Sequence, residues 1–69
     1  NSSRSNIDAL TRREKEILTL MSEYKTNQEI AEILYISSGT VRVHIHAILH
    51  KLEVSDRKQA IDIYFNSER

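Results

Sequence analysis

The stretch that decides the fold is residues 26–52, which read TNQEIAEILYISSGTVRVHIHAILHKL. Thr26 and Glu29 have the spacing of a capping box, so a helix is predicted to start there and to end near Tyr35. Ser37 then predicts the start of a second helix over about residues 38–52. Two helices joined by three or four residues, with the small Ala31 where they cross, are typical of a helix-turn-helix.

The rest of the chain adds one predicted helix on each side. Proline is absent and there is one glycine, so nothing in the sequence interrupts long helices or favours hairpins. Thr11 and Glu14 form a second capping box, with Leu10 as a lead-in apolar contact, and Ser55 is predicted to cap the last helix. The apolar residues of these two helices are Ile17, Leu18 and Met21, and Ala60, Ile61, Tyr64 and Phe65. The predicted fold class is all-α, a four-helix bundle that contains a helix-turn-helix.

The predicted helix over residues 38–52 has two chemically different faces. At about 100° per residue, one narrow arc is apolar and is expected to enter the core. It consists of Val41, Ile45, Ile48 and Leu52, and the opposite stripe consists of Gly39, Arg42, Val43, His46 and His50. The chain has no net charge, yet residues 33–52 contain no Asp or Glu. An acid-free surface of this kind suits a polyanion such as DNA.

Several residues of this helix are expected to contact DNA. Arg42 can pair with guanine O6 and N7, Val43 with a thymine methyl group, and His46 with bases or phosphates. The hydroxyls of Ser38 and Thr40 can donate to phosphate near the positive end of the helix dipole. A solvated Arg and a single exposed Val have ordinary explanations, and a protein-interaction bundle that docks a partner protein on this face is the alternative function.

Composition excludes several other classes of protein. Sixty-nine residues make one small domain with no room for a substantial pocket, so we expect no enzyme and no cofactor. His46 and His50 share a face but lack a third ligand, so no metal site is expected. The absence of Cys and of a long apolar run favours a cytoplasmic protein without a membrane span. The chain starts at Asn1 and residues 1–6 are polar, so residues 1–9 are interpreted as the remnant of a linker, or of an added cloning sequence, before a domain over residues 10–69.

Several motifs together resemble LuxR/FixJ-type DNA-binding domains. The matching segments are residues 10–18 (LTRREKEIL), 27–31 (NQEIA) and 40–44 (TVRVH), followed by Lys51-Leu52, Val54, Arg57 and Ala60. The resemblance covers most of the chain, from Leu10 to about Ile61. Two positions at which this family often has glycine are occupied by Tyr24 and Glu53, and Arg42 stands where Lys is usual.

The resemblance implies a transcription factor that reads DNA as a dimer. Residues matching Arg42, Val43 and His46 commonly contact bases in this family. Backbone contacts are assigned to Ser38, Thr40, His50 and Lys51. The fourth helix commonly forms the dimer interface, which nominates Ile61, Ile63, Tyr64 and Phe65. Packing onto the first helix is the alternative for these residues, and some of them are expected to do so. The expected partners are double-stranded DNA, a second copy of the chain, and an N-terminal receiver domain in a full-length response regulator.

Overall fold

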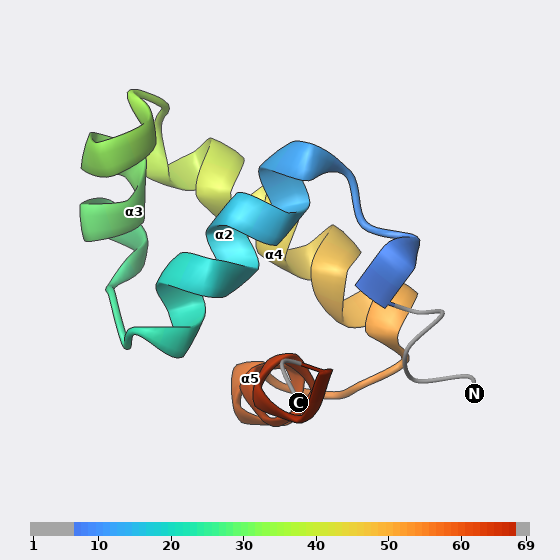
Figure 1. The fold of residues 1–69 in the computed structure, drawn as a ribbon. Coiled ribbons are helices and arrows are strands. Elements are labelled where there is room, and N and C mark those ends of the chain that lie inside the picture. Colours follow the sequence, from blue (N-terminus) through green and yellow to red (C-terminus); the bar gives the residue numbers. More distant parts are fainter. Residues whose placement is uncertain (1–6, 68–69) are drawn as a thin grey trace.

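The described part of the chain forms four α-helices and no strand. The computed structural model describes residues 7–67, the last of them by its backbone alone. The helices are α2 (Arg12–Ser22), α3 (Asn27–Leu34), α4 (Ser38–Leu52) and α5 (Arg57–Ser67). Helices α2 and α4 lie between α3 and α5, and each packs against the other three (Figure 1). The predicted all-α bundle with a helix-turn-helix at α3–α4 is confirmed.

The first three helices start where the sequence predicted. The Thr11 hydroxyl accepts the Glu14 amide, and the Glu14 carboxylate accepts the Thr11 amide in return. Thr26 and Glu29 repeat the arrangement at the start of α3. At the start of α4 the Ser37 hydroxyl accepts a hydrogen bond from the backbone N–H of Thr40 at 3.1 Å. These side chains satisfy amides that have no partner inside their helices.

The predicted cap of the last helix is wrong by one residue. Asp56 rather than Ser55 caps α5, because its Oδ1 accepts the Gln59 amide at 3.0 Å and its carbonyl accepts the Ala60 amide at 3.3 Å. The Gln59 side chain reaches back to accept the Ser55 amide at 2.9 Å. Gln stands three residues after Asp56, which is the spacing of a capping box, although its side chain accepts from the Ser55 amide rather than from that of Asp56. Lys stands three residues after Ser55.

A residue in the left-handed conformation follows each of α2, α3 and α4, directly after α3 and α4 and one residue after the cap of α2, and none of the three is glycine. Tyr24, Tyr35 and Glu53 have φ values of 64°, 59° and 57°. In each case the next amide bonds back across the helix end, as the Val54 amide does to the Leu49 carbonyl at 3.0 Å. This arrangement ends a helix abruptly and favours glycine at the left-handed position. It explains physically why glycine suits the positions of Tyr24 and Glu53.

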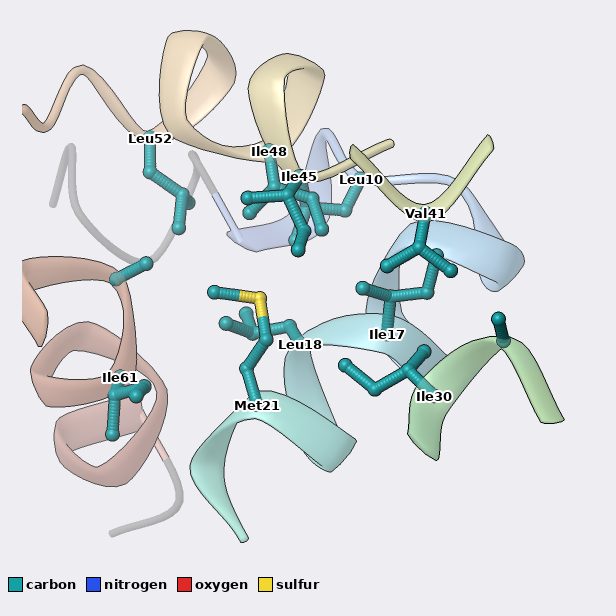
Figure 2. Packing of buried hydrophobic residues seen from close by; sticks show 12 residues of the cluster. Leu10, Ile17, Leu18, Met21, Ile30, Val41, Ile45, Ile48, Leu52 and Ile61 are labelled. Carbon is teal, nitrogen blue, oxygen red and sulfur yellow. The ribbon is translucent and has the colours of Figure 1, made fainter. Parts of the chain in front are cut away.

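The core lies where the apolar stripes of all four helices meet. Figure 2 shows Ile17 of α2, Ile30 of α3 and Val41 of α4 with their side chains directed toward one another. The predicted arc of α4 is confirmed, because all four of its members are buried. The buried apolar residues are Leu10, Ile17, Leu18, Met21, Ile30, Ala31, Val41, Ile45, Ile48, Leu52, Ala60 and Ile61.

The packed part of the chain extends beyond the predicted start of the domain at Leu10. Ile7 is half-buried against the core, and its carbonyl accepts the Leu10 amide at 3.1 Å. Ile7 therefore packs with the folded residues, whereas the sequence pattern places it in the linker remnant over residues 1–9. The polar residues 1–6 of that remnant lie outside the described residues.

Candidate nucleic-acid interface

The outward face of α4 presents the three predicted base-reading residues side by side. Arg42, Val43 and His46 are exposed, and Val43 has 68% of its surface accessible. Together with Gly39 they line one shallow, open depression. Because the opposite arc of α4 is anchored in the core, this face is held outward by packing. The structure therefore brings together the residues that periodicity had placed on one stripe.

The N-terminus of α4 differs electrostatically from those of the two helices before it. An acidic residue, Glu14 or Glu29, stands in the first turn of α2 and of α3, whereas the first turn of α4 contains none. The partial positive charge of this helix end is consequently left without an acidic partner on α4 itself. Ser38 and Thr40 are exposed there, and the Thr40 hydroxyl lies 2.9 Å from that of Ser37. The hydroxyls predicted to meet phosphate are thus at the surface.

The opposite end of α4 carries a cation that is already paired. The Lys51 ammonium donates to Glu14 Oε1 at 2.8 Å, so the last turn of α4 is tied to the first turn of α2. The Lys51 side chain is 35% exposed and that of Glu14 is 7% exposed. His50, the neighbouring candidate for backbone contact, is exposed. Lys51 is therefore held in place by a buried carboxylate and is only partly accessible to a ligand.

The environment of Glu14 favours its charged form. Burial by itself raises the pKa of the carboxyl, but the Lys51 hydrogen bond, the Thr11 amide and nearby His44 outweigh it, and the pKa lies below its ordinary value of 4.5. The carboxylate is thus ionised at neutral pH. His44 is half-buried at the edge of the apolar arc of α4.

Sequence reasoning missed two tertiary contacts. The Glu14–Lys51 pair joins residues 37 positions apart, beyond the reach of helical spacing rules. An acid on the apolar stripe of α2 was the signal that could have indicated a buried partner. The Arg57 guanidinium donates to Asn27 Oδ1 at 3.0 Å and to the Lys25 carbonyl at 3.4 Å. This clamp fixes the start of α3 relative to α5.

The four residues predicted for a dimer interface do not share one environment. Ile61 is only 7% exposed and belongs to the core, so it offers little surface to a second copy. Ile63 and Tyr64 are half-buried against the core. Phe65 is 47% exposed, and its ring meets that of Tyr64 edge to face, with centroids 5.8 Å apart. The part of the predicted interface that reaches the surface is therefore Ile63, Tyr64 and Phe65.

The described residues meet the requirements of neither a metal site nor a membrane span. Within residues 7–67, no three His, Asp or Glu side chains gather in a way that could hold a metal ion. In the same part of the chain, no helix has the combined length and apolar character that a membrane span demands.

Comparison with known proteins identifies the family to which the chain belongs. Residues 8–64 match the model of the bacterial regulatory proteins of the luxR family. The chain is 58% identical to the transcriptional regulatory protein LiaR of Bacillus subtilis over 53 residues, 77% of this chain and 25% of LiaR. It is 53% identical to the transcriptional regulatory protein DesR of the same organism over 57 residues, 83% of this chain and 29% of DesR. Identity to the response regulator protein VraR of Staphylococcus aureus is 50% over 54 residues, 78% of this chain and 26% of VraR.

The matched segment therefore spans only about a quarter of the length of these relatives. The family match, by contrast, covers most of this chain, and it includes α2, α3 and α4 completely and α5 up to residue 64. The chain belongs to the luxR family of bacterial regulatory proteins, and it is a helix-turn-helix DNA-binding domain of a transcriptional regulator.

Proposed function

We propose that the domain reads specific DNA sequences by placing α4 in a major groove. Arg42, Val43 and His46 meet base edges there. The observation that carries this proposal is their common exposure around one depression on an acid-free helix whose other face is anchored in the core. A side chain can read a base edge reproducibly only if its helix cannot rotate, and the buried arc of α4 supplies that restraint.

Contacts with the sugar-phosphate backbone come from both ends of α4. Ser38 and Thr40 act at its N-terminus, where no acid of the first turn opposes a phosphate. His50 and Lys51 act at its C-terminal end. The Lys51 ammonium has three N–H donors and gives one to Glu14, so the others remain available to a phosphate oxygen. Glu14 positions this cation in advance.

The complete regulator acts in the cytoplasm, where bacterial DNA lies, as a dimer on two half-sites, and carries an N-terminal receiver domain. The relatives support the receiver domain, because they are about four times as long as the matched segment and one of them is named a response regulator. A second copy doubles the contact area of a domain this small. Ile63, Tyr64 and Phe65 on α5 form the contact between the copies.

The test starts from duplexes that the 69-residue chain selects from a random-sequence pool. Binding is then measured for single-base variants of the selected site at several salt concentrations. Arg42→Ala is expected to cost about 1–3 kcal/mol on the selected site and to flatten the preference at one base pair. Lys58→Ala serves as the control, because it removes an exposed cation of α5 that lies outside the depression.

Two outcomes would contradict the proposal. An equal loss on every sequence would make Arg42 a phosphate contact, and the reading face would have to be reassigned. If Arg42→Ala behaves like Lys58→Ala, α4 is not the helix that reads bases.

A further inference from the structure

Gly39 occupies a position at which neither its own backbone nor the rest of the protein requires glycine. It is the sole glycine of the sequence and the second residue of α4. Its φ is not positive, whereas the left-handed positions of the described chain are filled by Tyr24, Tyr35 and Glu53. A glycine in the middle of a helix makes the helix less stable than an alanine would, by roughly 0.5–1 kcal/mol. The conformation of α4 thus gives no reason for glycine at this position.

Packing within the protein gives no reason either. Apart from the two chain neighbours and the backbone of its own helix, a Cβ atom built on Gly39 would meet only the Ser37 Oγ atom among the described residues, at an ordinary contact distance of 3.9 Å. Alanine would therefore fit without moving any neighbour. Gly39 is exposed, so the position borders solvent rather than another part of the protein.

The surroundings of that space indicate what kind of group it receives. Gly39 and Val43 are four residues apart, so they are adjacent on the outward face of α4 and form the apolar part of the depression. Arg42 and His46 provide its polar part. Among the groups that the four standard base pairs present in the major groove, the thymine 5-methyl is the apolar one. An apolar hollow on a helix that enters this groove is complementary to that methyl group.

We propose that the missing side chain at Gly39 leaves room for a thymine methyl group, which packs between the Gly39 backbone and the Val43 side chain. Gly39 is then a specificity-determining residue that acts through the space it leaves. This inference rests on the proposed function and deepens it, because it assigns one base of the recognised site to one hollow of the protein.

The test compares wild type, Gly39→Ala and the control Lys58→Ala, in which the second residue of α5 is changed instead. The probe is the duplex selected by wild type, together with a series in which each thymine in turn is replaced by uracil, which lacks the methyl group. We expect Gly39→Ala to melt at the same temperature as wild type or higher. It is also expected to bind the selected duplex about tenfold more weakly, since one surplus methyl in a filled apolar pocket has an effect of that order.

The decisive measurement is rescue by uracil. At one position, replacing thymine by uracil should weaken DNA binding by wild type severalfold, because the hollow then lacks its methyl group. The same replacement should restore most of the affinity lost by Gly39→Ala, because the alanine methyl group then fills the hollow in place of the thymine methyl group. Uracil at the remaining positions should affect both proteins equally, and Lys58→Ala should show the wild-type pattern throughout.

Equal binding of the selected duplex by Gly39→Ala and wild type would refute the inference, since the hollow would then accept an extra methyl without consequence. A loss that no uracil substitution rescues would also refute it, and would place a sugar or phosphate beside Gly39. Either result leaves the proposed function standing. If wild type enriches no sequence from the pool, the proposed function fails together with this inference.

Discussion

The ion pair between Glu14 and Lys51 joins α2 to α4, and its contribution to the free energy of unfolding can be measured separately from DNA binding. Lys51→Met removes the charge and keeps most of the aliphatic stem, while Glu14→Gln removes the opposite charge and keeps an acceptor for the Thr11 amide. Either change leaves one partner of a 2.8 Å contact without its counterion.

The expected magnitude follows from how unequally the two groups are buried. Removing one member of a fully buried pair costs about 3–5 kcal/mol, whereas an exposed pair contributes about 0–1 kcal/mol. Glu14 is 7% exposed but Lys51 is 35% exposed, so solvent screens the interaction substantially. Lys51→Met is therefore expected to destabilise the fold by about 1–2 kcal/mol, because it leaves the buried carboxylate unpaired. Glu14→Gln should cost about 1 kcal/mol, since Lys51 can turn toward water.

The pair also predicts how stability depends on pH. The folded-state pKa of Glu14 lies below its ordinary value of 4.5. Its contribution is consequently complete above the unfolded-state pKa and disappears as the pH falls through the folded-state pKa. The stability difference between wild type and Glu14→Gln should thus be present at neutral pH and shrink on acidification below about pH 4.5. Thr11 continues to donate its amide to residue 14 in the variant.

Urea unfolding followed by far-ultraviolet circular dichroism measures these differences in a double-mutant cycle. The matched control is Glu16→Gln, whose partner Arg13 lies 3.3 Å away on the exposed face of α2. This control should cost less than about 0.5 kcal/mol. The reasoning is refuted if the two single changes add without coupling, or if Lys51→Met costs no more than the control. On DNA, Lys51→Met should lower the salt slope by about one unit, while Glu14→Gln should leave the slope unchanged.

Three smaller predictions concern the helix ends and α5. Glu53→Gly should stabilise the fold by about 1 kcal/mol, because relief of left-handed backbone strain exceeds the added entropy of the unfolded chain. Glu53→Ala keeps the strain and is the control, so an equal rise in the melting temperature of both variants would argue against this account. Asp56→Ala should cost about 1 kcal/mol in urea unfolding, and a larger cost for Ser55→Ala would restore the cap predicted from the sequence. Ile63→Glu and Phe65→Ala should remain helical but bind two-half-site DNA less cooperatively in gel-shift titrations, and unchanged cooperativity in both would move the dimer interface off α5.

Most of the helical framework followed from local chemistry. Thr11, Thr26 and Ser37 mark their helix starts because a side-chain oxygen and an amide three residues later are close in any chain that turns there. The apolar arc of α4 follows equally from a periodicity of 3.6 residues, since opposite faces of a helix cannot both enter one core. Arg42, Val43 and His46 were placed at the surface by the same argument.

The sequence by itself thus determined the number of helices, most of their starts, and the division of α4 into a buried arc and an outward face. Each of these depends on residues within one or two turns of each other. Only the tertiary structure decided that Lys51 is held by Glu14, that Ile61 belongs to the core rather than to the surface of α5, and that Arg57 reaches Asn27. The physical reason is that these contacts join separate helices, and their partners depend on how the helices cross.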